Sequence, residues 1–100
     1  MPTQANSGAA AATEITLDVE LESGAECQVW SDRKLKVGED VILWRSDDAG
    51  SNYDHKDTSA GADGVLLNSL KGSNSFRGPG YFRVIWPATT FGDRILYVDT

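Results

Sequence analysis

The stretch TEITLDVELES, residues 13 to 23, alternates apolar and polar side chains from one end to the other. One face carries Ile15, Leu17, Val19 and Leu21, and the opposite face carries only Thr, Asp and Glu. A period of two residues is that of a β-strand with one buried and one solvated face. No segment of helical length carries an apolar stripe at 3.6 spacing, so the stretch indicates an all-β fold.

Five further short apolar segments follow, separated by clusters of Gly, Asp, Asn and Ser that favour turns. They lie around residues 28–30 and over residues 41–45, 65–70, 81–86 and 94–98. No connection between them is long enough to hold a crossover helix, so we expect antiparallel pairing. The pattern predicts one domain over residues 13–100, a small antiparallel β-sandwich of the immunoglobulin-like or jelly-roll-like type.

Residues 1–12, MPTQANSGAAAA, are small or polar and end in four alanines. They cannot bury enough apolar area to offset the entropy lost on ordering. Four alanines are also too few to nucleate an isolated helix. We therefore expect a flexible N-terminal arm over residues 1–12, with an arm that orders along a neighbouring subunit as the alternative.

The charge balance excludes two classes of partner. The 100-residue chain has a net charge of −6 with no basic run, and both nucleic acid and an anionic membrane need a cationic footprint. The N-terminus lacks the features of a signal peptide, and no apolar run approaches a membrane span. We expect neither partner, and a reducing cytoplasm as the place of synthesis. The single cysteine, Cys27, allows no intrachain disulfide and is expected to be buried in a strand.

No motif in the sequence carries catalysis. His55, the only histidine, lies in a polar stretch and is expected to be exposed, and neither a nucleophile elbow nor a phosphate loop is present. The acidic loop 47–63 offers oxygen ligands to calcium but lacks the EF-hand spacing, so a solvated surface loop is favoured. We therefore predict a protein that is not an enzyme and that has no catalytic residues, no cofactor and no metal site.

Three strands carry apolar side chains on both faces: residues 41–44, 81–86 and 95–98. A two-layer sandwich covers only one face of each sheet, so apolar surface is left over. Such a surplus favours association with another protein, with the loop 47–63 folding back over it as the alternative. The expected core or interface residues are Trp44, Tyr81, Phe82, Arg83, Trp86 and Tyr97, with Arg83 as the polar anchor.

The three tryptophans, Trp30, Trp44 and Trp86, have three interpretations. They fill the sandwich core, they form a protein interface, or they stack on sugar rings. The last interpretation makes a carbohydrate-binding module or host-surface adhesin the alternative function. It requires an exposed tryptophan in a groove with polar neighbours.

Three longer stretches carry a resemblance to a known group. They are MPTQANSGAAAATEITLDVE (1–20), an arm leading into a strand; LKVGEDVILWRSDDAG (35–50), a turn, an apolar strand and a polar tip; and GPGYFRVIWPATTFGDRILYVD (78–99), which contains a strand ended by proline and the last strand. In these stretches the chain resembles the small β-sandwich structural proteins of tailed-bacteriophage virions, such as head decoration (cement) proteins and fibre-base modules.

The resemblance implies a non-enzymatic virion protein, made in the host cytoplasm, that stabilises or decorates the capsid shell. Its partner would be the major capsid protein or another shell protein, contacted through the apolar sheet face and the arm. The arm or an exposed sheet edge would engage that partner by adding a strand to a sheet. A homo-oligomer, with a trimer favoured, is expected.

Overall fold

The computed structural model describes residues 3–8, 14–88 and 94–100, and of residues 3–8 only the backbone. The regular structure of the described part is β, apart from a single 3-10 turn at Ala62–Gly64. The strands are β1 (Thr3–Gly8), β2 (Ile15–Leu21), β3 (Glu26–Ser31), β4 (Val41–Ser46), β5 (His55–Lys56), β6 (Val65–Leu67), β7 (Ser73–Arg77), β8 (Gly80–Trp86) and β9 (Arg94–Asp99).

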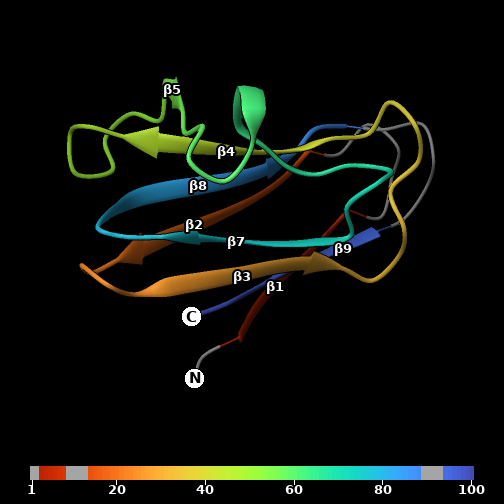
Figure 1. Cartoon of the computed structure of the whole chain (residues 1–100), viewed down its shortest axis with the longest axis horizontal. Helices are drawn as coiled ribbons and strands as arrows, with labels where there is room; N and C mark the ends of the chain where they lie inside the picture. The colour runs from red at the N-terminus through yellow and green to blue at the C-terminus, as the bar shows by residue number, and fades with distance from the viewer. Residues whose placement is uncertain (1–2, 9–13, 89–93) are drawn as a thin grey trace.

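The strands form two antiparallel sheets that pack as two layers (Figure 1). The first sheet has the order β1-β9-β3-β7, and the second has the order β2-β8-β4-β5, with β6 also paired to β4. Successive strands alternate between the sheets, except that β4, β5 and β6 share one sheet. This wrapping, with the first strand beside the last, is that of a jelly roll and differs from the immunoglobulin order. The predicted small all-β sandwich is confirmed.

The core lies between the sheets and follows the period-two patterns. Along β2 every second side chain is buried, starting with Ile15, as the alternation predicts. Leu17 lies opposite Val84 on β8, which in turn lies opposite Leu43 on β4, so one apolar row crosses the second sheet. Cys27 is fully buried on the inner face of β3, as expected.

Three strands arise where the sequence predicted none: β1, β7 and the two-residue β5, which lies within the predicted surface loop 47–63. β7 has the sequence SNSFR, polar except for Phe76, yet it pairs along β3. Phe76 is its one buried side chain, and the ring centroid of Phe76 lies 4.9 Å from that of Phe82 in the other sheet. An edge strand needs few apolar side chains, because its backbone hydrogen bonds to the neighbouring strand hold it.

Another unexpected strand is β1, which lies within the segment predicted to be a flexible arm. Residues Thr3–Gly8 pair in register with Asp99–Arg94 of β9 in the same chain. The edge of β9 offers unpaired N–H and C=O groups, so pairing compensates for the lost entropy without apolar side chains. Residues 1–2 and 9–12 lie outside the described residues, and the division into an arm and a domain at residue 12 stays a prediction.

Candidate functional site

Three of the predicted interface residues, Trp44, Tyr81 and Arg83, lie partly buried on the outer face of the second sheet. Arg83 stands opposite Asp18 on one side and Trp44 on the other, so the three form a row across β2, β8 and β4. Arg83 donates two hydrogen bonds to the Asp18 carboxylate, at 2.7 and 3.0 Å. These bonds raise the pKa of Arg83, so its charge is held on this face.

The loop after β4 folds back over part of this face. Tyr53 in this loop places its ring 4.2 Å from the Arg83 guanidinium carbon. Lys56, on β5 opposite Trp44, places its ammonium 5.5 Å from the Trp44 ring. At Gly50 an added Cβ would lie 3.5 Å from Tyr81 Cδ1 on β8, so the loop contacts the sheet there. The surplus apolar face is therefore partly covered from within the chain, which was the alternative to a partner protein.

The other three predicted residues are divided between the core and the first sheet. Phe82 and Trp86 are 2% and 0% exposed, so they belong to the core and present no surface to a partner. Tyr97 lies on the outer face of the first sheet, where it stacks on Trp30 with ring centroids 5.5 Å apart. Both rings are partly buried, and the polar Ser73 lies opposite Trp30 on β7.

The acids of the loop after β4 support its turn. Asp48 accepts hydrogen bonds from the Ser46 hydroxyl at 2.7 Å and from the backbone and side chain of Asn52, which lower the pKa of Asp48 to about 2. His55 is exposed, as predicted, and its Nε2 lies 3.3 Å from the Asp47 carboxylate. Within the described residues no group of three or more His, Cys, Asp or Glu side chains is placed to hold a metal ion.

A different surface stands out at the end of the sandwich where β3 and β6 finish. Val37 is 84% exposed and Leu70 is 94% exposed, and no other large apolar side chain in the described part of the chain is as open. Val37 lies in the β3–β4 loop and Leu70 in the β6–β7 loop, drawn yellow and teal in Figure 1. Both residues line one hollow of about 360 Å³. The rest of its lining is Lys34, Leu35, Lys36 and Ser69.

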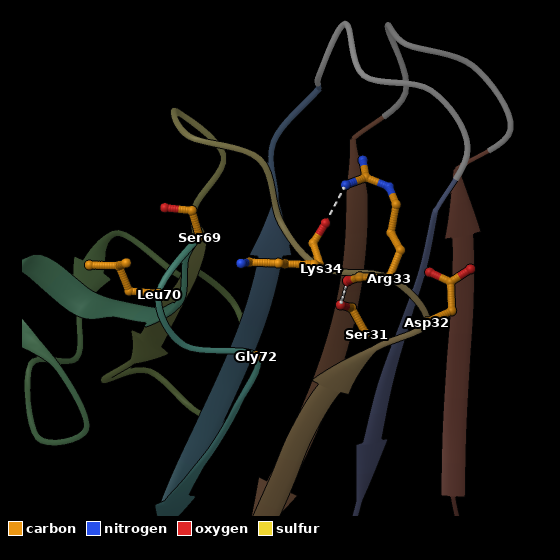
Figure 2. A pocket seen from close by; sticks show the side chains of 7 residues that line it. All are labelled: Ser31, Asp32, Arg33, Lys34, Ser69, Leu70 and Gly72. Atoms are coloured by element: carbon orange, nitrogen blue, oxygen red, sulfur yellow. Dashed lines mark hydrogen bonds between the residues drawn. The ribbon is translucent and has the colours of Figure 1, made fainter.

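A second hollow, of about 540 Å³, lies beside the first and shares Lys34, Ser69 and Leu70 with it. Its lining is Ser31, Asp32, Arg33, Lys34, Ser69, Leu70 and Gly72 (Figure 2). The Ser31 hydroxyl donates to the Arg33 carbonyl, and the Arg33 guanidinium donates to the Lys34 carbonyl at 3.0 Å. Figure 2 shows the Lys34 side chain directed toward the loop that carries Leu70. We call the surface formed by both hollows the loop-end surface.

A buried acid holds one wall of the loop-end surface in place. Glu39 is 4% exposed and accepts two hydrogen bonds from Arg33, at 2.8 and 3.0 Å. It also accepts the backbone N–H of Lys36 at 2.8 Å and the indole N–H of Trp86 at 3.3 Å. Arg94, buried against the same indole ring, has its pKa lowered by burial, while the hydrogen bonds that Arg33 donates to Glu39 raise the pKa of Arg33. The β3–β4 loop is thus tied to the core.

Three exposed lysines, Lys34, Lys36 and Lys71, border the loop-end surface. None of them forms an ion pair with another residue of the described ranges. The Asp32 carboxylate accepts the backbone N–H of Ile95 at 2.8 Å, and Asp40 is exposed. A chain with a net charge of −6 therefore carries, beside the most exposed apolar side chains of its described residues, a local group of lysines that are unpaired within those residues.

Sequence reasoning missed this surface. It predicted a strand over residues 65–70, but β6 ends at Leu67, and Asn68 and Lys71 exchange two backbone hydrogen bonds at 3.1 Å that close a turn. Leu70 therefore points away from the sheet. The one signal in the sequence was a leucine flanked by Ser and Lys-Gly, which are residues typical of a turn.

Fold and surface together define a jelly-roll β-sandwich with an apolar, lysine-bordered surface at one end. No protein-family model, curated protein or solved structure matches this chain. The described residues contain no helix with the length and apolar character needed to cross a bilayer.

Proposed function

We propose that the chain is a non-enzymatic structural protein that attaches to a protein shell, stabilises or decorates it, and resides in a virion. Its partner is the major capsid protein or another shell protein. The proposal follows from the resemblance to virion β-sandwich proteins. The exposure of Val37 and Leu70 at one end of the molecule is the observation that carries it.

Exposed aliphatic side chains of this kind favour a contact. Burying a leucine or valine side chain contributes roughly 1.5–3 kcal/mol, and Leu70 is 94% exposed in the free chain. The loops that present both residues are braced by internal hydrogen bonds, through Glu39 in one loop and Asn68 in the other. Less conformational entropy is therefore lost when a partner binds.

The mode of attachment differs from the one expected from the sequence. Tyr53 and Lys56 cover part of the apolar sheet face, and the N-terminal strand β1 pairs with β9. We therefore assign the main contact to the loop-end surface. The outer edge of β1, which has no strand partner among the described residues, remains suited to strand addition by the shell protein.

Binding to shells tests the proposal. Purified chain is mixed with assembled shells of the virus that encodes it, and bound chain is counted after sedimentation. We expect stoichiometric binding, and light scattering on a sizing column is expected to give a trimer for the free chain. A chain that stays monomeric and does not sediment with shells contradicts the proposal.

A second candidate function, a carbohydrate-binding module or adhesin, would use the stacked pair of Trp30 and Tyr97, although Trp30 is partly buried and the function requires an exposed tryptophan. The pair lies on the outer face of the first sheet beside Ser73. A sugar ring that stacks on Trp30 would change its fluorescence, and Trp30→Phe would remove that change, while Trp44→Phe would not. Fluorescence that stays constant across a glycan panel excludes this candidate.

A further inference from the structure

We propose that the loop-end surface binds a short acidic segment of the partner protein. In this arrangement an aliphatic side chain of the segment sits between Val37 and Leu70, and its carboxylates lie on Lys34 and Lys36. The inference rests on the proposed function, since it specifies the chemistry of the contact that the shell protein makes.

The hollow between Val37 and Leu70 has the properties of a binding pocket for one apolar side chain. Its volume of about 360 Å³ falls at the lower end of the range of ligand pockets, roughly 300–1,000 Å³. Leu35, which is 1% exposed, contributes an apolar wall that is continuous with the core. The two rims of the hollow are the exposed side chains of Val37 and Leu70. An apolar group that enters the hollow is therefore shielded from water by these two side chains and by Leu35.

The charge around the hollow selects the sign of the ligand. Lys34 and Lys36 line it, Lys71 is next to Leu70 in the chain, and none of the three is paired within the described residues. Arg33 is already engaged by Glu39. Lysines that lie beside an apolar pocket and are unpaired in the described part of the chain complement a ligand in which carboxylates flank an aliphatic residue.

Both loops hold their exposed residues outward. The Leu70 N–H donates to the Asn68 side-chain oxygen at 2.9 Å, within the turn closed by Asn68 and Lys71. In the other loop, the Glu39 carboxylate accepts the Lys36 N–H beside Val37. The apolar side chains are therefore presented to a ligand and cannot easily collapse onto the core.

Two other occupants fit less well. An anionic membrane would attract the same lysines, but the net charge of −6 opposes approach, and a hollow suits one side chain better than a flat surface. In a symmetric dimer formed through this surface, Lys34 and Lys36 of one copy would face the same lysines of the other copy, and these like charges repel each other.

The test is a nuclear magnetic resonance titration of the full-length chain, labelled with ¹⁵N, with synthetic peptides. The probe peptide places two leucines between pairs of glutamates; one control replaces the glutamates by lysines and the other replaces the leucines by serines. We expect the probe alone to shift the amides of residues 34–37 and 69–72, with a dissociation constant of about 0.1–1 mM. No shift at about 5 mM probe, or equal shifts from the lysine peptide, overturns the proposal.

Variants separate the apolar and charged contributions. Leu70→Asp is expected to weaken probe binding by about tenfold, equivalent to roughly 1.4 kcal/mol, and Val37→Asp provides a second test of the same wall. The double variant Lys34→Gln, Lys36→Gln is expected to weaken probe binding by about threefold. The matched control Lys56→Gln, on the outer face of the second sheet, is expected to leave probe binding unchanged. An unchanged amide spectrum away from both loops shows that each variant folds. Full binding by Leu70→Asp overturns the proposal.

The remaining outcomes identify a different occupant or separate this inference from the proposed function. The proposal is overturned if the chain sediments with phosphatidylcholine–phosphatidylglycerol vesicles and Leu70→Asp abolishes this sedimentation. It is also overturned if the chain self-associates and Leu70→Asp abolishes the self-association. Shell binding that survives both Leu70→Asp and Val37→Asp overturns this inference while the proposed function stands. Probe binding by a chain that ignores shells supports the surface and counts against the proposed function.

Discussion

The indole N–H of Trp86 donates a hydrogen bond to the Glu39 carboxylate at 3.3 Å, in the buried end of the sandwich. Trp86 ends β8 in the second sheet, and Glu39 belongs to the loop that enters β4. Because the same carboxylate also binds Arg33 and the Lys36 N–H, one acid joins the core to the loop that presents Val37.

Glu39→Gln is expected to lower the free energy of unfolding by about 2–4 kcal/mol, because Arg33 loses its ion-pair partner and the buried Arg94 loses a nearby negative charge. Urea unfolding followed by tryptophan fluorescence measures the change. Glu22→Gln, in the exposed turn after β2, is the control and is expected to change stability by less than about 0.5 kcal/mol. Equal effects of the two variants would contradict the role of Glu39.

Arg83 and Tyr53 are expected to be energetically coupled, since the guanidinium lies over the phenol ring at 4.2 Å. A double-mutant cycle with Arg83→Ala and Tyr53→Ala should give a coupling of about 0.5–1 kcal/mol. Chemical denaturation of the four proteins measures it. Strictly additive effects would mean that the loop does not depend on this contact.

Cys27 is expected to make stability fall at alkaline pH. Burial raises the pKa of its thiol from 9.0 to about 11, so the folded chain keeps the proton that the unfolded chain releases. The stabilisation is complete below pH 9 and is lost as the pH rises through 11. Unfolding free energies measured from pH 8 upward should fall more steeply for the natural chain than for Cys27→Ala. Parallel pH profiles would contradict the assignment.

Gly78→Ala is expected to lower the melting temperature strongly, by about 5–15 °C. An added Cβ would lie 2.3 Å from the Glu22 carbonyl oxygen and 2.8 Å from the Leu21 Cβ, so the backbone must move. Gly72→Ala is the matched control, because nothing lies within 4 Å of its Cβ position. Calorimetry of both variants checks the prediction, which fails if their melting temperatures agree.

Removal of residues 2–8 is expected to lower the melting temperature and to cause association that depends on concentration. The deletion exposes the edge of β9, whose unpaired backbone groups then template pairing between chains. Thermal unfolding and light scattering measure both effects, and a synthetic peptide of residues 1–8 should reverse them. A truncated chain that is monomeric and equally stable would contradict the pairing of β1 with β9.

Much of the fold was predictable because burial in a strand repeats every second residue. The alternation from Ile15 to Leu21 correctly predicted the inner face of β2, and the absence of helical periodicity predicted the two-layer β architecture. β1 and β7 could not be predicted in the same way. Their pairing depends on backbone groups, which every sequence possesses, and not on apolar side chains.

The candidate site was predicted less well. The pattern over residues 81–86 places Tyr81 and Phe82 on opposite faces of the strand. Which of the two faces is buried depends on the sheet that packs against the strand. Phe82 and Trp86 consequently proved to be core residues, whereas Tyr81 and Arg83 lie outside. The burial of Glu39 and Arg94 had no sequence signal, because a charged side chain is buried only where partners converge from distant strands.

By itself, the sequence determined the strand periodicity, the turn positions and the acidic balance, since each depends on neighbouring residues or on simple sums. Only the tertiary structure decided that the loops of Val37 and Leu70 meet at one end and line one open hollow. That meeting depends on the wrapping of successive strands between two sheets, which brings together loops that no local pattern connects.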